Sequence, residues 1–379
     1  MLVFLKIISY GLIIASSGLT LAVVFYYFFR RLTGARGKTA PSGELPSVSI
    51  INVAGEERRW TEDSIRTMFV TLYKGNVEVI FSTKDMDSPY VSTAMSVSMK
   101  FPQTGMVLNE FHPPQHQFEK ASLEVSGAKV AQNSVLVFVD PDVVLDSSLI
   151  EEMVYALGRG NQIAVVPAGF RPSNYPLSSA LCFLMNSTTL NPKFSFYMTL
   201  GASLSNKIVA VPKDLYNETI ARNPDALNRY SSLEALARRE GNPIRTILLE
   251  KGAIKFVEAR ALKDLFQSLK FETLNAAGGR KFYSLLALLA VCGIPASLFA
   301  AVFLKIPIAV LLLPFAAKTA ALSTPLYNSM RGGARTAGLI LSPLTDTLIF
   351  LVSICSFIKP SFEIGGRRYR IRNSLLFPE

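Results

Sequence analysis

The N-terminal apolar run limits what this chain can fold into. Residues 7–29 form a run of roughly 23 residues, about the length that crosses the hydrocarbon core of a bilayer. The run ends in consecutive aromatic residues, and Arg30 and Arg31 follow directly. Aromatic rings at the headgroup level and arginines beyond them are typical of an anchor whose next segment is cytoplasmic. Because no small-residue cleavage site precedes a polar mature start, we predict a retained signal-anchor at residues 1–31.

The segment after the anchor has the composition of a linker and then of a folded domain. Residues 32–46 contain Gly, Pro and Ser, which interrupt regular structure. Residues 47–275 are long enough for one well-buried domain. The whole chain is 50% hydrophobic and only 18% charged, which is too apolar for an ordinary soluble protein of this size. We therefore predict an integral protein of the cell membrane whose domain at residues 47–275 is cytoplasmic.

A C-terminal membrane region is expected at residues 281–360. Two apolar runs, 282–304 and 306–322, are separated only by Lys305. Each run is about long enough to span a bilayer. The pattern predicts a tight helical hairpin at residues 282–323 that crosses the membrane and returns.

The last apolar run, residues 337–358, allows two topologies. It contains Pro343 and Asp346, and a carboxylate in a lipid-facing span is costly. If this run spans the membrane, the basic tail at residues 361–379 lies outside, which the positive-inside rule disfavours. We favour a re-entrant or interfacial helix over a spanning one.

The charge and the cysteines exclude other classes of protein. The formal net charge is +11, but much of the basic charge lies beside the apolar runs, and no motif for binding DNA or RNA accompanies it. That placement favours membrane orientation and contact with lipid headgroups over nucleic acid as a partner. The three cysteines, Cys182, Cys292 and Cys355, have no metal-ligand spacing and cannot form a fully paired disulfide framework.

Between the apolar ends, short β-branched runs alternate with longer helical stretches, which is the pattern of an α/β domain. Strands are expected at residues 48–53, 77–82, 135–139, 163–166 and 207–211, and helices at residues 61–73, 118–131 and 231–240. In open parallel sheets, ligands bind beyond the carboxyl ends of the strands. Acidic residues follow two of these strands, and we expect the binding site there.

Asp140-Pro141-Asp142 follows the most apolar of the expected strands. Two carboxylates separated by one residue can present one to a hard divalent cation and the other to sugar or ribose hydroxyls. Mg²⁺ and Mn²⁺ favour few carboxylates together with phosphate oxygens of a substrate. The alternative is a plain strand-to-helix turn, with Ser148 and Glu151 as a capping box. The position at the end of a central strand favours a metal site formed by Asp142 and Asp140.

Other polar residues are weaker candidates. Asp85 and Asp87 follow the second strand, where a carboxylate can accept hydrogen bonds from a base or ribose, and the alternative is a polar loop. Lys120 opens the helix before the central strand, where it could face a phosphate or be solvated. His112 and His116 have the spacing of a metal pair on a helix, but the two prolines between them forbid a helix, so we expect a loop.

The order of these features resembles that of family 2 glycosyltransferases, and the ceramide glucosyltransferase-like branch in particular. The residues that carry the resemblance are Gly55, Asp87-Ser-Pro, Lys120-Ala, Asp140-Pro-Asp142, Gln267-Ser-Leu-Lys270-Phe271, Pro343-Leu-Thr-Asp346 and the basic segment that ends at Arg372. The resemblance implies a GT-A-like, mixed, mostly parallel sheet between N-terminal and C-terminal transmembrane helices. It also implies inverting transfer of a sugar from a nucleoside-diphosphate sugar, with a UDP-sugar expected, to a membrane lipid with Mn²⁺ or Mg²⁺ as cofactor.

The resemblance also implies roles for single residues. Asp142 would hold the metal. The donor-binding residues would be Asp87, Asp85, Lys120, Asp140, Gln267 and Lys270.

The chain departs from the family pattern at three places. Residues 228–232 have no carboxylate where the family has its general base, which leaves Glu234 as a weak catalytic candidate. Lys270 and Phe271 replace an arginine and a tryptophan, and a lysine cannot make the bidentate fork of an arginine. Asn52 stands where a lysine is expected. A general base contributes ~10²–10⁴-fold to a rate, so the alternative hypothesis is a catalytically silent homologue that binds nucleotide-sugar or acts as a scaffold.

Overall fold

The computed structural model describes most of the chain. The described residues are 2–34, 45–114, 119–157, 163–175, 177–182, 207–222, 244–246, 253–276, 288–289, 292–322, 342–359, 361–364, 367–372 and 375–378. They divide into two compact units. The terminal unit consists of Met1–Gly37, Pro172–Ser205 and Val257–Glu379, and the sheet unit consists of Lys38–Arg171 and Asn206–Phe256.

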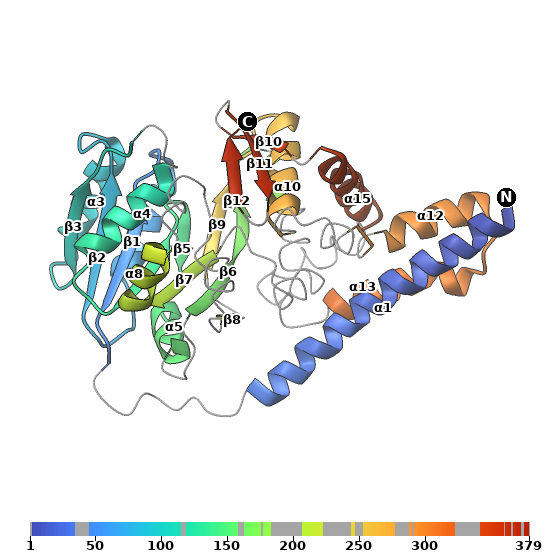
Figure 1. The fold of residues 1–379 in the computed structure, drawn as a ribbon, viewed down its shortest axis with the longest axis horizontal. Helices are drawn as coiled ribbons and strands as arrows, with labels where there is room; N and C mark the ends of the chain where they lie inside the picture. Colours follow the sequence, from blue (N-terminus) through green and yellow to red (C-terminus); the bar gives the residue numbers. More distant parts are fainter. Residues whose placement is uncertain are drawn as a thin grey trace. The chain divides into compact units, whose positions relative to one another are not determined.

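The sheet unit is built on a mixed sheet with the strand order β3-β2-β1-β4-β7-β6-β9-β5, and β8 pairs with β6 (Figure 1). The strands are β1 (Val48–Val53), β2 (Val77–Thr83), β3 (Gly105–Glu110), β4 (Val135–Val139), β5 (Val143–Leu145), β6 (Ile163–Pro172), β7 (Lys207–Pro212), β8 (Ile244–Thr246) and β9 (Ala253–Val257). Strands β3, β2, β1 and β4 are parallel, whereas β7 runs antiparallel to both β4 and β6. The predicted α/β class and mixed sheet are confirmed.

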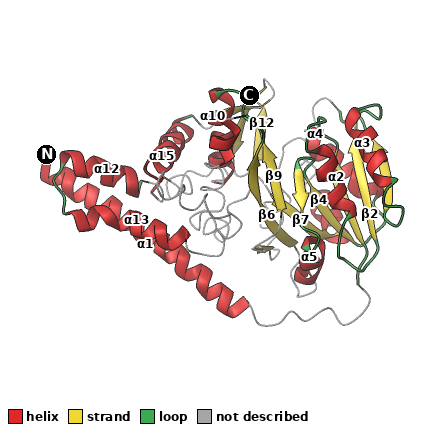
Figure 2. Ribbon diagram, turned by 180° about the vertical axis from the view of Figure 1, so that it is seen from behind, coloured by secondary structure: helices red, strands yellow, loops and turns green. Residues whose placement is uncertain are grey.

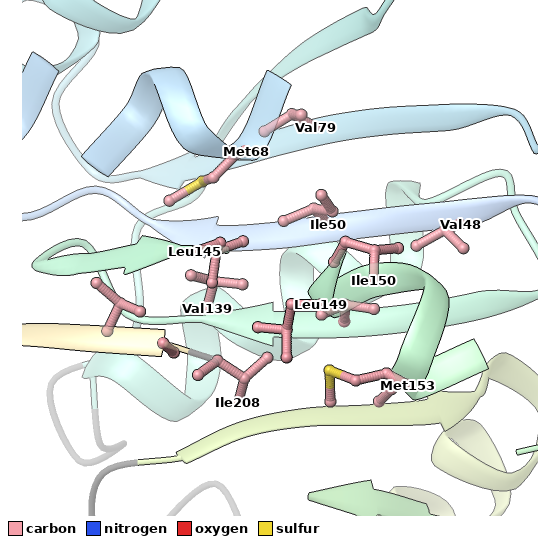
Figure 3. Close-up of a cluster of buried hydrophobic side chains, with 14 of the residues drawn as sticks. Val48, Ile50, Met68, Val79, Val139, Leu145, Leu149, Ile150, Met153 and Ile208 are labelled. Atoms are coloured by element: carbon pink, nitrogen blue, oxygen red, sulfur yellow. The ribbon is translucent and has the colours of Figure 1, made fainter. Parts of the chain in front are cut away.

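Helices cover both faces of the sheet, because successive strand residues point to opposite sides. The helices are α2 (Thr61–Phe69), α3 (Pro89–Ser98), α4 (Glu119–Val130), α5 (Leu149–Leu157) and α8 (Lys213–Arg222). Ile50 belongs to a buried cluster that holds residues of α2, α3 and α5, among them Met68 and Met153 (Figure 3). Its neighbour Ile51 belongs to a second cluster, with residues of α4 and with Tyr216 of α8.

Two helix ends show how tertiary contacts and local chemistry set the boundaries. We expected a helix over residues 61–73, but α2 ends at Phe69. The chain beyond it bonds elsewhere, since the backbone N–H of Leu72 donates to the carbonyl of Ser147 at 2.8 Å. Helix α3 was not predicted. Ser88 caps it by accepting a hydrogen bond from the backbone N–H of Val91, and Pro89 stands in its first turn.

The terminal unit contains the N-terminal helix and the C-terminal elements (Figure 2). Its helices are α1 (Leu2–Gly34), α10 (Leu262–Ala276), α12 (Gly293–Phe303), α13 (Ile308–Leu322) and α15 (Ser342–Ile358). Helix α1 packs closely on α12 and α13. A Cβ added at Gly293 would lie 2.5 Å from Ser16 Oγ and 3.3 Å from Pro314 Cβ, so only glycine permits this approach. Ile13 is fully buried in the same contact.

Among the described residues, one helix is long and apolar enough to cross a membrane by length and composition, and it covers Leu2–Ala22 of α1. Within residues 282–323, the structure describes α12 with 11 residues and α13 with 15 residues, and Lys305 between them has a φ of 48°. Residues 282–287, 290, 291 and 323 lie outside the described residues, so the hairpin of two spans stays a prediction. In the last apolar run, α15 has 17 residues.

The basic tail forms a small antiparallel sheet in the terminal unit. Its strands are β10 (Ser361–Ile364), β11 (Arg367–Arg372) and β12 (Leu375–Pro378), in that order. Four of the six residues of β11 are arginines, a composition that gave no strand signal in the sequence.

Candidate active site

The residues that follow β1, β2 and β4 lie at one edge of the sheet, because these strands are parallel and in register. Asp140-Pro141-Asp142, called here the D-P-D turn, connects β4 to β5. The backbone N–H of Val143 donates to the carbonyl of Asp140 at 3.2 Å, which closes the turn. Both carboxylates are partly buried, with 14% of the side chain of Asp140 and 29% of that of Asp142 exposed.

Two lysines pair with the D-P-D turn. Lys120, at the start of α4, forms an ion pair and hydrogen bond with Asp140 Oδ1. Lys255, on β9, donates to Asp140 Oδ2 at 2.8 Å, and its Nζ lies 3.4 Å from Asp142 Oδ1. Lys120 and both aspartates were predicted site residues, and the structure brings these three together. Lys255 was not predicted, because its only signal in the sequence is a charge inside a short apolar strand.

The two carboxylates differ in their electrostatics. Burial alone would raise the pKa of Asp140, but the ammonium groups of Lys120 and Lys255 outweigh it and hold that pKa below its usual range. Burial raises the pKa of Asp142, since Lys255 offsets it incompletely and Asp140 adds repulsion. Burial would lower the pKa of Lys255, but the two aspartates reverse the effect and raise it. Asp140 is thus a firmly ionised partner of both lysines.

Glu124 adds a third carboxylate behind Lys120. Its Oε1 lies 3.8 Å from Lys120 Nζ. Burial raises the pKa of Glu124 to about 7 against the attraction of Lys120, and Asp140 adds to the increase. The charge around Lys120 therefore changes near neutral pH.

The residues of the turn fit one divalent cation through Asp142. Both oxygens of Asp140 are engaged by lysines, whereas Asp142 Oδ1 is buried and accepts no hydrogen bond. A hard cation prefers such an oxygen and completes its coordination with water and substrate phosphates. No group of three or more His, Cys, Asp or Glu is arranged for a metal in the part of the chain that the structure describes. The donor itself would therefore have to supply ligands.

A buried asparagine fixes the strand that ends in the turn. Asn52 on β1 is completely buried, and its Nδ2 donates to the carbonyl of Val139 at 3.0 Å. The hydroxyl of Tyr90 donates to Asn52 Oδ1 at 2.8 Å. Burial raises the pKa of Tyr90 far above its ordinary value, and the charge of Asp142 adds to the increase. Asn52, which replaces an expected lysine, thus positions the backbone directly before Asp140.

The loop after β1 closely approaches the D-P-D turn. A Cβ added at Gly55 would lie 2.8 Å from Pro141 Cγ, a distance that real Cβ atoms essentially never show. The proline ring is rigid and cannot move aside as a flexible side chain can. Any side chain at this position would push the loop and the turn apart.

An aromatic stack joins the same loop to β9. The rings of Trp60 and Phe256 lie 5.0 Å apart with an interplanar angle of 13°. The guanidinium of Arg58 lies 5.8 Å from the Trp60 ring centroid, and that of Arg171 lies 5.9 Å from the Phe256 centroid. The stack was not predicted, because its members are far apart in the sequence.

The other predicted residues are found in a loop of the sheet unit, in the terminal unit and outside the described residues. Asp85 and Asp87 are exposed in the loop between β2 and α3, where Asp85 Oδ1 accepts a hydrogen bond from the backbone N–H of Asp87 at 3.0 Å. Gln267 and Lys270 lie on α10 in the terminal unit, and Lys270 is buried. Glu234 lies outside the described residues.

Of the two histidines, the structure describes only His112. His112 is exposed in the chain after β3, outside any helix, as the two prolines predicted. His116 lies outside the described residues.

Three of the solved structures that match this chain are similar to it at 13–15% identity. A mannosyltransferase from Pyrobaculum calidifontis, in complex with GDP-Man and Mn²⁺, is 14% identical over 93% of this chain and 99% of that chain, with a TM-score of 0.49. Residues 1–349 of TarS from S. aureus, in complex with UDP, are 13% identical over 86% of this chain and 96% of that chain, with a TM-score of 0.37.

A third solved structure is also similar to this chain, and part of the sequence matches a family model. Glucosyl-3-phosphoglycerate synthase from Mycobacterium tuberculosis, in complex with Mn²⁺, UDP and phosphoglyceric acid, is 15% identical over 58% of this chain and 73% of that chain, with a TM-score of 0.35. No curated protein matches the sequence. Residues 15–195, slightly less than half of the chain, match the model of glycosyl transferase family 21. The matched segment includes β1 to β4 and the D-P-D turn, and it supports the prediction that the chain is a glycosyltransferase.

Proposed function

We propose that the chain is a membrane-anchored inverting glycosyltransferase. It transfers a sugar from a nucleoside-diphosphate sugar, for which we expect a UDP-sugar, to the hydroxyl of a membrane lipid. The observation that carries the proposal is the D-P-D turn at the carboxyl ends of parallel strands, partly buried and paired with two lysines. The family 21 match over the same strands supports the reaction class. The ceramide glucosyltransferase-like branch is part of the proposal and rests on the sequence resemblance.

Asp142 is the residue that we assign to the divalent cation, Mn²⁺ or Mg²⁺. Its Oδ1 is buried without a hydrogen-bond partner, while both oxygens of Asp140 are occupied. A bound cation would offset the negative charge of the departing nucleoside diphosphate. Asp140 keeps Lys120 beside the donor, and Asp85 and Asp87 are exposed after β2, which β1 separates from β4, and are available to a base or ribose.

The transfer itself exchanges one bond for another. The acceptor hydroxyl oxygen attacks the anomeric carbon, the bond from that carbon to the diphosphate breaks, and the hydroxyl proton passes to a base. Single displacement inverts the anomeric centre. Glu234 is the weak candidate for the base, and Gln267 and Lys270 are assigned to the diphosphate or the acceptor on the strength of the resemblance.

The lipid acceptor and the membrane location rest on the terminal unit. Helix α1 has the length and apolar composition of a span over Leu2–Ala22. Its aromatic end and the arginines after it favour a cytoplasmic location for the sheet unit. An acceptor that reaches the site from the bilayer would give the tether a function.

Donor binding and turnover test the proposal together. Detergent-purified protein is heated with UDP-sugars and GDP-sugars, with and without Mn²⁺, and sugar transfer into a lipid extract is measured in parallel. We expect a donor to raise the melting temperature, and we expect Asp142→Asn to lower transfer by roughly 100-fold or more. The matched control is Asp63→Asn, which removes an exposed carboxylate on α2 and should change neither quantity.

Two results would contradict the proposal. If no donor stabilises the protein under any condition, the chain has no nucleotide-sugar site. If Asp142→Asn transfers sugar as fast as the unmodified protein, the cation assignment is wrong. Donor binding without any transfer to lipid would instead support the silent homologue.

A further inference from the structure

Lys255 lies between the two carboxylates of the D-P-D turn. Its Nζ is 2.8 Å from Asp140 Oδ2 and 3.4 Å from Asp142 Oδ1. The side chain is 19% exposed, so it is mostly buried but still accessible to a ligand at the strand ends. The point between the two carboxylates, where a cation would contact both, is therefore occupied by an ammonium group of the chain itself.

The backbone holds Lys255 in this place. Strands β5 and β9 pair antiparallel, with Lys255 opposite Val143, the residue directly after Asp142. The backbone N–H of Phe256 donates to the carbonyl of Asp142 at 2.9 Å. Lys255 is thus attached to the turn through neighbouring hydrogen bonds, unlike a surface lysine that finds a carboxylate by chance.

The aromatic stack adds a second support. Phe256, next to Lys255, stacks on Trp60 at 5.0 Å, and Trp60 follows the loop whose Gly55 approaches Pro141. The loop after β1, the D-P-D turn and β9 therefore pack as one assembly around the ammonium group. A lysine in such surroundings loses little side-chain freedom when it binds a ligand, which favours affinity.

The charges of the cluster favour a phosphate ligand. Asp140 and Asp142 carry two negative charges, and Lys120 and Lys255 carry two positive charges. Two bare carboxylates would attract a divalent cation strongly, but the two ammonium groups together offset their charge and weaken that attraction. A diphosphate gains instead, because an ammonium group forms short, strong hydrogen bonds with phosphate oxygens.

We propose that Lys255 is the built-in cation of the donor site and binds the diphosphate of the nucleotide directly, so that donor binding does not depend on a divalent metal ion. The proposal rests on the proposed function, since it names the residue that recognises the diphosphate of the same donor. It leaves the metal at Asp142 as an addition to this binding and not as its condition.

Calorimetric titration of the full chain in detergent tests the proposal. UDP, UMP, GDP and GMP are titrated in EDTA and again in Mn²⁺, into the unmodified protein, Lys255→Met, Lys255→Arg and the control Lys100→Met. Lys100 is an exposed lysine that pairs with Glu62 on the surface. We expect the diphosphate to bind the unmodified protein in EDTA with an affinity within roughly tenfold of that in Mn²⁺.

Lys255→Met should weaken diphosphate binding in EDTA by roughly 10- to 100-fold, the range of a lost hydrogen bond to a charged group. It should weaken monophosphate binding less, because the second phosphate is the group that Lys255 holds. Lys255→Arg keeps the positive charge and should restore most of the affinity, and Lys100→Met should behave as the unmodified protein. A merely structural role of Lys255 would weaken the diphosphate and the monophosphate equally.

Each contrary result has a separate meaning. Diphosphate binding that requires Mn²⁺ would overturn the role of Lys255 and leave the proposed function in place. Equal diphosphate affinities of Lys255→Met and the unmodified protein in EDTA would overturn it too. Absence of nucleotide binding in both EDTA and Mn²⁺ would contradict the proposed function itself. If Lys255→Met fails to fold, the EDTA and Mn²⁺ affinities of the unmodified protein still decide the question.

Discussion

Two acidic pairs with the same spacing follow parallel strands on either side of β1, and their surroundings in the structure differ. Asp85 and Asp87 follow β2, are exposed, and bond within their own loop, where Asp85 accepts from the backbone N–H of Asp87. Asp140 and Asp142 follow β4, are partly buried, and contact two lysines. Both pairs therefore lie at the end of a strand, but among the described residues only Asp140 and Asp142 form a cluster with lysines.

The difference comes from what packs around each pair. Asp85 and Asp87 lie next to the N-cap of α3, where Ser88 accepts a hydrogen bond from the backbone N–H of Val91. The contacts of this pair are therefore with residues nearby in the sequence. The second receives Lys120 from α4 and Lys255 from β9, which is 115 residues along the chain from Asp140. A D-x-D spacing thus indicates a candidate, and distant parts of the fold decide what it can bind.

The largest expected effect compares one residue from each pair. Asp140→Asn removes the carboxylate that contacts both partly buried ammonium groups, and we expect a loss of about 3 kcal/mol in the free energy of unfolding. Asp87→Asn removes an exposed carboxylate and should change it by less than about 0.5 kcal/mol, while still weakening donor binding. Thermal unfolding of the full chain in detergent measures the first quantity, and calorimetry measures the second. Equal stability losses in the two variants would contradict the comparison.

The next largest effect is expected at Asn52, which holds the end of β4 directly before the D-P-D turn. Asn52→Ala removes two buried hydrogen bonds and leaves the carbonyl of Val139 and the hydroxyl of Tyr90 without partners, which we expect to cost about 2–3 kcal/mol. Tyr90→Phe removes one of these bonds and its donor together, and should cost about 1 kcal/mol. Chemical unfolding of both variants measures the two losses in the free energy of unfolding and gives their ratio. A loss for Asn52→Ala no larger than that for Tyr90→Phe would show that the bond to Val139 contributes nothing.

Much of the sheet could be predicted from the sequence, because its strands have local signals. The β-branched runs gave β1 and β4 within the observed bounds, and β2 short by one residue. Strand β6 runs to Pro172, well beyond the expected end at residue 166, since it pairs with both β7 and β9. Short β5 and β9, with few residues each, have no periodicity to detect.

The candidate site could be predicted only in part, for the same reason. Asp140, Asp142 and Lys120 have signals in their own segments, because each lies at a strand end or a helix start. Lys255 and the Trp60–Phe256 stack are joined to the turn only by strand pairing and packing, which no local pattern reveals. The functions assigned to Gln267, Lys270 and Glu234 stay predictions.

A smaller effect is expected in the pH dependence of stability, through Glu124 beside Lys120. The pKa of Glu124 is raised to about 7 in the folded protein, so its contribution to stability is complete below pH 4.5 and is lost as the pH rises through 7. Because 26% of its side chain is exposed, we expect solvent to reduce this loss to roughly 2 kcal/mol. Lys120 attracts the ionised form, whereas Asp140 opposes it.

Glu124→Gln should therefore gain stability over the unmodified protein between pH 5 and pH 8, as measured by melting temperature across that range. The matched control is Glu119→Gln on the same helix, whose carboxylate is 57% exposed and pairs with Lys84 at the surface. The melting temperature of Glu119→Gln should differ from that of the unmodified protein by an amount that is nearly independent of pH. A constant difference for Glu124→Gln would mean that its carboxyl group ionises normally.

The smallest expected effect concerns the contact between the loop after β1 and the D-P-D turn. Gly55→Ala places a Cβ within 2.8 Å of Pro141 Cγ, so loop and turn must separate by a few tenths of an ångström. We expect a cost of about 1 kcal/mol in stability and a similar loss in donor affinity. Pro141→Ala removes the clashing atom, so the double variant should recover part of the loss, a coupling that a double-mutant cycle measures. Strictly additive effects would mean that the two residues act independently, and the loop after β1 would then have no part in holding the charged pair.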